Sequence, residues 1–310
     1  MTYRVVIYLQ PWEIDDFQRQ TYTLIQSSYD IKDIKDINEE KVIIDVTLNL
    51  HMVDWKKSKL PKQYFIDKFL YLETILSNHF QVEFDTDEKI NGSLDKRRSI
   101  QNKKQDCIIW LDSDIHFSST VLPTMIAAAS VIKDECYILS NQTIKLWDKS
   151  WDLLTADRYI NESYDFKVSF NVFELDKAIY RKTQNMKVSP YIKFGGGWMT
   201  LLSNKVLEQI PLIDELGSYG PDDSYIMYCG MFTKQLRQYI MNDIVVGEEN
   251  DNLKINKDYI RPLLSLKTAS NRDRITDEYL ADLVEIYIKN YIKIQNEHTE
   301  IKSSNIRITE

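Results

Sequence analysis

Two pairs of aspartates stand where carboxylates can do chemistry. Asp112 and Asp114 directly follow the apolar run Cys107–Leu111, and the serines and threonine from Ser118 onward predict the start of a helix. Carboxylates at the carboxyl end of a parallel strand face the crevice in which open α/β sheets bind ligands. Two of them one residue apart can reach one hard cation, such as Mg²⁺ or Mn²⁺, or the ribose of a nucleotide. We therefore predict a metal and nucleotide site at Asp112 and Asp114.

The same spacing recurs at Asp85 and Asp87, but no strong helix signal follows this copy. We interpret Asp85 and Asp87 as part of a solvated loop.

The second pair, Asp222 and Asp223, precedes a predicted helix. Acids at a helix N-terminus are the expected partners of its dipole, so capping is one interpretation. The alternative is a general base, because these acids come after the predicted metal site and after a glycine-rich segment.

That segment contains most of the glycine in the chain. Average usage of about 7% would give roughly twenty glycines, whereas this sequence has eight, six of them between Gly195 and Gly230. The run Gly195-Gly196-Gly197, followed by Trp198, lets another group approach the backbone closely. It predicts either a wall against which a flat ligand lies or a tight turn with a bulge between strands.

The elements that must position these residues alternate between two patterns. Short β-branched runs predict strands, and segments with a helical period predict helices. The predicted strands are 5–9, 41–50, 107–111 and 136–139, and the predicted helices are 13–28, 65–80, 121–132 and a segment that opens at Thr276. This alternation predicts an α/β fold, a mostly parallel sheet flanked by helices. We expect one domain over 1–250 and a C-terminal extension over 251–310, whose amphipathic helix packs on that domain or, less simply, lies on a membrane surface.

Taken in order, three segments resemble a known family. IIWLDSDIHF, KFGGGWMTLLSNKVLEQI and SYGPDDSYIM are similar to the DxD strand, the acceptor-side strand and helix, and the ED-type catalytic motif of nucleotide-diphospho-sugar transferases with the GT-A fold. The similarity is greatest to the family-2-like inverting glycosyltransferases and covers roughly residues 3–245. It implies a GT-A, Rossmann-like domain that transfers a hexosyl group from a UDP- or GDP-sugar to an acceptor hydroxyl, on a glycan or another molecule.

The resemblance also implies roles for individual residues. Asp114 would hold the Mn²⁺ or Mg²⁺ that bridges the donor phosphates, and Asp112 would contact the ribose or the ion. Asp223 would be the base, and Asp222 would orient the acceptor. The implied donor-side contacts are Arg97 or Arg98, Pro11 and Asn49, and the implied acceptor-side contacts are Gly196, Gly197 and Trp198.

The sequence departs from the family pattern in several places. The first acid of the ED-type pair is Asp222 rather than glutamate, so the base assignment stays open between Asp222 and Asp223. No histidine stands where some relatives have a further metal ligand, and Glu248 is the candidate substitute. The acid that commonly reads uracil is also unsettled, because Asp45 lies inside an apolar run and Asn49 or Asp54 could serve.

The composition of the chain limits its possible partners and cellular location. The chain has 310 residues, a net charge of −8 and an isoelectric point near 5.2, which argues against a nucleic-acid partner. Three widely spaced cysteines and no apolar stretch long enough for a membrane span lead us to expect a cytoplasmic protein. The competing functions are a nucleotidyltransferase acting on sugar phosphates, which would usually carry a basic glycine-rich loop after its first strand, and a catalytically inactive nucleotide-sugar-binding module.

Overall fold

The most apolar runs of the chain become neighbouring strands that are covered on both faces. The computed structural model describes residues 1–33, 41–51, 53–87, 92–145, 199–217, 222–230, 236–248, 285–287 and 289, and all structural statements below concern these residues. Its strands are β1 (Thr2–Leu9), β2 (Lys41–Asn49), β3 (Gln81–Asp87), β4 (Cys107–Trp110), β5 (Ile115–His116), β6 (Tyr137–Lys145), β7 (Thr200–Ser203) and β8 (Arg237–Glu248).

These strands form a single sheet in the order β3-β2-β1-β4-β7-β6-β8-β5. The β3, β2, β1 and β4 strands are parallel. The β7 strand runs antiparallel to both β4 and β6, β8 runs parallel to β6, and β5 is antiparallel to β8. Six strands therefore point the same way, and only β5 and β7 oppose them.

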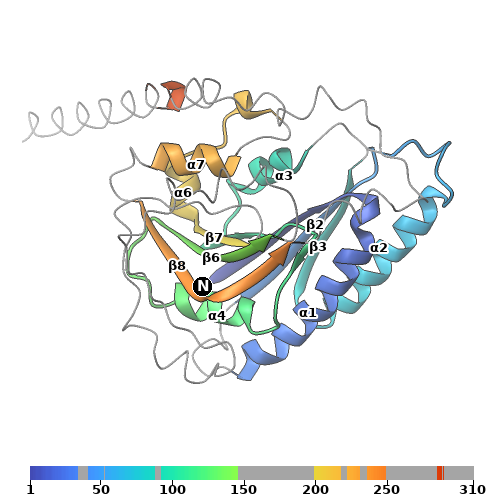
Figure 1. Ribbon diagram of the computed structural model, residues 1–310, viewed down its shortest axis with the longest axis horizontal. Coiled ribbons are helices and arrows are strands. Elements are labelled where there is room, and N and C mark those ends of the chain that lie inside the picture. The colour runs from blue at the N-terminus through green and yellow to red at the C-terminus, as the bar shows by residue number, and fades with distance from the viewer. Residues whose placement is uncertain are drawn as a thin grey trace, which may run out of the picture.

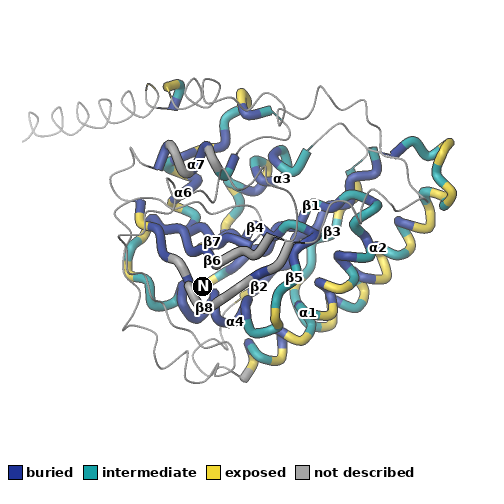
Figure 2. The backbone as a smooth tube through the Cα atoms, in the orientation of Figure 1, coloured by how far each residue is buried: buried dark blue, intermediate teal, exposed yellow. Residues whose placement is uncertain are grey.

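Helices cover both faces of the sheet (Figure 1). The helices are α1 (Ile14–Asp33), α2 (Lys62–Ser77), α3 (Ser93–Ile100), α4 (Val121–Ala129), α6 (Asn204–Gln209) and α7 (Asp222–Gly230), with short 3₁₀ turns η1 (Pro11–Glu13) and η3 (Asp214–Leu216). The first face carries α1, α2 and α4, whose apolar sides form one core with the sheet. The opposite face carries α3, α6 and α7 over a second core, and Figure 2 shows the buried strands between the two layers.

The predicted fold class, a GT-A-type mostly parallel sheet flanked by helices, is confirmed by this strand order and layering. The predicted strands and helices up to residue 139 are found, but β6 ends six residues and α1 five residues beyond the expected ends. The helix opened by Thr276 falls largely outside the described residues, and of that segment only 285–287 and 289 are placed as helix. The sequence also predicts strands and loops over 141–193. Residues 141–145 of this segment belong to β6, whereas most of the remainder and the predicted boundary at 250 lie outside the described residues.

Two details of the sequence interpretation are wrong. Asp85 and Asp87 do not lie in a solvated loop but end strand β3, where Asp87 pairs in register with Asn49. The sequence QVEFDTD hides this strand because only two of its residues, Val82 and Phe84, are apolar. In addition, Thr120 is the N-cap of α4 but its side chain makes no capping hydrogen bond there.

Candidate functional site

The parallel strands bring their carboxyl ends to one edge of the sheet. Pro11 follows β1, Asn49 ends β2, Asp87 ends β3, and Asp112 lies just beyond β4. Ligands of open α/β sheets bind outside this edge. The structure thus gathers residues from four separate parts of the sequence, and we call this place the carboxyl-edge site.

The loop that follows β4 is held in place by hydrogen bonds from α1. The side-chain amide of Gln20 donates hydrogen bonds to the carbonyl oxygens of Asp112 and Ile115, at 2.7 and 2.9 Å. The Ser113 hydroxyl donates to Glu13 Oε2 at 2.7 Å, and that same oxygen accepts the backbone N–H of Gln10. Both aspartates of the DSD sequence are therefore carried on a loop fixed at its two ends and its middle.

The two carboxylates of this loop differ in exposure. Asp114 is 8% exposed, whereas the side chain of Asp112 is 46% exposed. Within the described residues no group of three metal-ligating side chains occurs. Mg²⁺ and Mn²⁺ are nevertheless suited to such a place, because Mg²⁺ is usually held by one or two carboxylates, with water and substrate phosphates completing its ligands. The oxygen donors present therefore fit such an ion.

Arg97 joins the two acidic motifs. From α3, its Nη2 donates to Asp112 Oδ1 at 3.0 Å and its Nη1 donates to Asp222 Oδ2 at 2.6 Å. The side chains of Arg97 and Asp222 are 10% and 6% exposed. Residues that are far apart in the sequence therefore converge on one guanidinium, as the predicted site requires.

The surroundings of Arg97 keep it charged. Burial alone would lower the pKa of its guanidinium, but Asp222, Asp112 and Asp223 raise it above the ordinary value. The guanidinium also lies over the Trp110 ring, 4.5 Å from its centroid. A cation on an aromatic face gains electrostatic stabilisation from the ring quadrupole. Arg97 is therefore a fixed positive charge at the carboxyl edge.

The two acids that begin α7 are not equivalent. Asp222 is buried and bound to Arg97, whereas Asp223 is only half-buried. A carboxylate that already accepts a short charge-assisted hydrogen bond from a buried guanidinium has less capacity to take a proton from a substrate. The two acids thus differ in their burial, and which of them is the base stays a prediction.

Arg98 has a different use from Arg97. Its guanidinium donates to the carbonyl oxygens of Leu212, Ile213 and Gly217, at 2.8 to 3.0 Å, and pairs with Asp95. These bonds fasten the segment around η3 to α3. Of the two arginines expected at the donor, only Arg97 reaches the acids of the site.

Pro11 and Asn49, which the sequence analysis assigns to the donor side as a prediction, lie at the ends of the first two strands. Pro11 is buried and opens η1, and the Asn49 side-chain oxygen accepts the backbone N–H of His51. Nearby, burial and then the carboxylates of Asp87 and Asp95 raise the pKa of Tyr8, which hydrogen-bonds Asp87. Its phenol therefore stays neutral, as a hydrogen-bonding group would at this edge.

Asp45, the other acid considered for uracil, is not at the edge. It lies in the middle of β2, pairs in register with Val6 and Glu83, and forms ion pairs with Arg4 and Lys96. Asp54 lies beyond the end of β2 and pairs with Lys57.

Glu248 reaches the site through the sheet. It is the last residue of β8, and its backbone pairs with Ile115, next to Asp114. This register places position 248 beside the DSD loop, as a residue that supplements the metal ligands would require.

Gly196, Gly197 and Trp198 lie outside the described residues. The strand that follows them, β7, enters the sheet at the carboxyl edge, since Thr200 pairs with Trp110. Their acceptor-side role stays a prediction.

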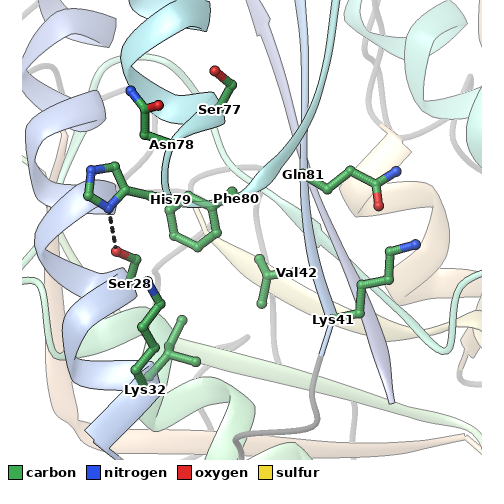
Figure 3. Close-up of a pocket in the computed structure, with 10 residues that line it drawn as sticks. Ser28, Lys32, Lys41, Val42, Ser77, Asn78, His79, Phe80 and Gln81 are labelled. Atoms are coloured by element: carbon green, nitrogen blue, oxygen red, sulfur yellow. Dashed lines mark hydrogen bonds between the residues drawn. The ribbon is translucent and has the colours of Figure 1, made fainter.

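A cavity of about 390 Å³ lies at the opposite edge of the sheet (Figure 3). Lys41 and Gln81, at the starts of β2 and β3, line it together with Ser28 and His79. The Ser28 hydroxyl donates to the carbonyl oxygen of Ile25 and lies 3.1 Å from His79 Nδ1. A serine whose proton is committed to a carbonyl is not an activated nucleophile, and we assign this cavity no part in the chemistry of the carboxyl-edge site.

Comparison with known proteins gives similarities in structure only. No protein-family model and no curated protein sequence matches the chain. Residues 1–349 of S. aureus TarS are 11% identical to this chain, with a TM-score of 0.43 over 78% of this chain and 60% of that one. GalNAc-T7 with UDP, GalNAc and Mn²⁺ is 13% identical, with a TM-score of 0.49 over 94% and 49%. The mannosyltransferase PcManGT from Pyrobaculum calidifontis, in complex with GDP-Man and Mn²⁺, is 11% identical, with a TM-score of 0.40 over 79% and 56%.

This chain thus spans about half to three fifths of the length of these three structures. The assignment to the GT-A fold rests on the strand order and the helical layers. At these TM-scores the matches show nothing about substrate or mechanism.

Two positioning residues and one pairing escaped the sequence interpretation. Gln20 looks like an ordinary residue of a helix, and nothing in its neighbours indicates that it supports a loop 92 positions later. Glu13 begins the predicted helix 13–28, and nothing near it indicates that it binds Ser113, 100 positions later. Asp222 was recognised as an acid of the motif, but its pairing with Arg97 depends on a contact across 125 positions.

Proposed function

We propose that the chain is a metal-dependent glycosyltransferase that moves a hexosyl group from a UDP- or GDP-sugar to an acceptor hydroxyl, with inversion. The observation that carries this proposal is the convergence of Asp112 and Asp222 on the Arg97 guanidinium at the carboxyl edge of the sheet. That convergence provides both halves of such a reaction: a cationic place for the leaving diphosphate and carboxylates beside it.

The donor side is the loop after β4. Asp114, Asp112 and position 248 would hold Mn²⁺ or Mg²⁺, and such an ion, when bound, neutralises charge on a departing diphosphate. Arg97 adds a permanent positive charge at the same place. Preorganised charges of this kind stabilise negative charge as it develops, at no cost of reorganisation during the reaction. Pro11 and Asn49 would border the nucleoside.

The acceptor side is the start of α7. Asp223 is the better base because Asp222 is committed to Arg97 and Asp223 is not as deeply buried. Asp223 would accept the proton of the acceptor hydroxyl as that oxygen attacks the anomeric carbon. Attack from the side opposite the leaving group inverts configuration. Asp222 then serves to hold Arg97 and the first turn of α7 in place, and Gly196, Gly197 and Trp198 would border the acceptor.

We also propose that the chain works in a reducing compartment such as the cytoplasm. The buried cysteines Cys107, Cys136 and Cys229 form no disulfide bond with one another, which is typical of proteins in such a compartment. No helix among the described residues is long and apolar enough to cross a membrane.

The test is turnover with a panel of nucleotide sugars and Mn²⁺. The purified chain is mixed with each UDP- or GDP-sugar, with and without simple hydroxyl acceptors, and the released phosphates are separated. Release of a nucleoside diphosphate that stops when EDTA is added supports the proposal. Pyrophosphate formation from a sugar phosphate and a nucleoside triphosphate would instead identify a nucleotidyltransferase, and binding without any turnover would identify an inactive binding module.

A further inference from the structure

A cluster of charged side chains surrounds the buried Asp45 and Arg4, away from the carboxyl edge. Asp45, in the middle of β2, is 1% exposed and forms ion pairs with Arg4, Lys96 and Lys103. Arg4 also binds Glu83 through both of its terminal nitrogens, at 2.7 and 3.0 Å. We call these five residues the Asp45 cluster. It fills the space between the sheet and α3.

The helix above this cluster is the one that carries Arg97. Only Leu94, Arg97 and Ile100 of α3 are buried, so apolar contacts hold this short helix over a small area. The remaining attachments are polar. Lys96 reaches down to Asp45, and Arg98 binds the carbonyl oxygens around η3. Ion pairs and hydrogen bonds therefore attach α3 to the sheet to a large extent, whereas apolar packing attaches α1 and α2.

The Lys96 attachment determines the direction of Arg97. Successive residues of an α-helix point about 100° apart around its axis. When Lys96 is tied to β2, the rotation of α3 is set, and the adjacent Arg97 is directed toward β4 and α7. The Lys96 side chain is only 14% exposed, so the tie is made inside the protein and not on its surface.

Stability alone is a poor reason for the presence of Asp45. Desolvating a carboxylate costs several kcal/mol, and a buried ion pair is often no more stabilising than apolar residues of the same volume. All residues of β2 from Val42 to Val46 except Asp45 are apolar, so an apolar side chain at position 45 would continue the pattern. What an apolar residue could not do is fix two lysines and an arginine.

We propose that Asp45 is a positioning residue of the donor site, which acts through Lys96 to place the Arg97 guanidinium. This inference rests on the proposed function, because it gives Arg97 a donor phosphate to bind. Asp45 itself does not touch the substrate.

The test compares binding of UDP and of GDP, each with Mn²⁺, by calorimetry in the full chain and its variants. Asp45→Asn and Lys96→Met should each weaken binding of the preferred nucleotide about tenfold, the scale on which supporting partners of a binding site act. Lys96→Arg, which retains a cation, should recover most of the loss. The matched control is Asp15→Asn, which breaks the Lys68–Asp15 ion pair between α1 and α2 on the other face and should leave affinity within about twofold.

A loss of stability must be separated from a loss of positioning. Leu76→Ala removes a fully buried side chain of α2 and lowers stability without touching α3, so its affinity should stay that of the wild type. Amide hydrogen exchange of the ligand-free protein should quicken over 93–100 in Asp45→Asn but not in Leu76→Ala.

Two results would overturn this inference and leave the proposed function standing. One is wild-type nucleotide affinity in Asp45→Asn, and the other is an equal loss of nucleotide affinity in Leu76→Ala. If the wild-type chain binds neither nucleotide, the proposed function is overturned, and the donor-site role of Asp45 with it.

Discussion

At the scale of single residues, one guanidinium has to serve several carboxylates. Arg97 binds Asp112 and Asp222 together, and removing one partner of a buried charge pair costs about 3–5 kcal/mol because the other charge is left unpaired. An anion that arrives at the site would meet an arginine already oriented by these two bonds. The acids around Arg97 thus have distinct duties even though all of them are aspartates.

Asp223→Asn should separate binding from chemistry. If Asp223 takes the acceptor proton, the amide should lower kcat by roughly 10²–10⁴-fold, while the affinity for the nucleotide diphosphate with Mn²⁺ stays within about twofold. Steady-state kinetics and calorimetry on the same preparation measure the two effects. Full activity in this variant would contradict the assignment of the base.

Asp114→Ala should act on the opposite side of the reaction. Loss of a carboxylate that would hold the ion should abolish the stimulation of nucleotide binding by Mn²⁺, since such ions depend on one or two protein carboxylates. Titration of Mn²⁺ in the presence of UDP or GDP measures this. The control is Asp85→Ala, which removes an acid with the same spacing at the end of β3. This variant should retain the wild-type response to the metal.

Sequence could predict which residue types form the site but not their pairing. Asp112 and Asp114 can be identified from the sequence because they follow an apolar run, and Asp222 and Asp223 because they begin a helix. The sequence does not distinguish Arg97 from Arg98. Neighbouring residues of a helix point in different directions, and only the packed structure shows which arginine faces the acids. The separate duties of Asp222 and Asp223 follow from the same fact.

At the scale of elements, α1 supports the loop that carries Asp112 and Asp114. Gln20 occupies the carbonyl oxygens of Asp112 and Ile115, so the loop conformation depends on a helix that belongs to the first βα unit. Buried carbonyl groups that lose such a donor are costly, at about 1–3 kcal/mol each.

Gln20→Met should therefore damage the site from a distance. The substitution retains the side-chain length and removes both hydrogen bonds, so we expect a loss of roughly 2–4 kcal/mol in stability and weaker binding of nucleotide with Mn²⁺. Denaturant unfolding and calorimetry measure these. Gln238→Met is the comparison, because Gln238 is also buried and its amide bonds Ser140 in another part of the sheet; it should cost stability but not affinity. Equal affinity losses in both variants would contradict a specific role for Gln20.

Helices and strands could be predicted from sequence where their apolar residues form a clear pattern. The strands β1, β2 and β4 are buried on both faces, so their sequences are nearly continuous apolar runs. Strand β3 is half-exposed and polar, and its sequence lacks that signal. The sequence of α3 gives no sign that ion pairs attach this helix to the sheet, because Asp45 lies about fifty positions earlier in the chain.

At the scale of the whole molecule, the two faces of the sheet are held by different forces. The face under α1, α2 and α4 is a continuous apolar core, whereas the face under α3 combines an apolar core with the Asp45 cluster. Composition and periodicity predict the first kind of face. They cannot predict the second, since ion pairs across three strands and a helix leave no periodic trace.

The stability of the fold should consequently depend on acid pH through this cluster. The hydrogen bond from Arg4 lowers the pKa of Glu83 to about 2, aided by Lys103 and opposed by burial, from an ordinary value of 4.5. A carboxyl whose pKa is lower in the folded state contributes stability above its unfolded value, and that contribution is lost as the pH falls toward the folded value.

Thermal melting of the wild type and of Glu83→Gln should show this between about pH 5 and pH 2. The wild type should be the more stable protein at neutral pH, and the difference in Tm should shrink through that window. Glu208→Gln, which breaks the surface pair with Lys205, should show no such convergence. A constant difference between wild type and Glu83→Gln would contradict the role of the charge.

One contact on the α7 side bears on the order in which the protein can be made. The ring of Tyr287 is 3% exposed and packs edge-on against Tyr225 of α7, with centroids 6.4 Å apart. During synthesis the chain emerges from its N-terminus onward, so the helix that presents Asp222 and Asp223 leaves the ribosome before the aromatic ring that covers it. The sheet strands and helices made before α7 can settle while translation continues, whereas α7 gains its contact with Tyr287 only when the late segment arrives.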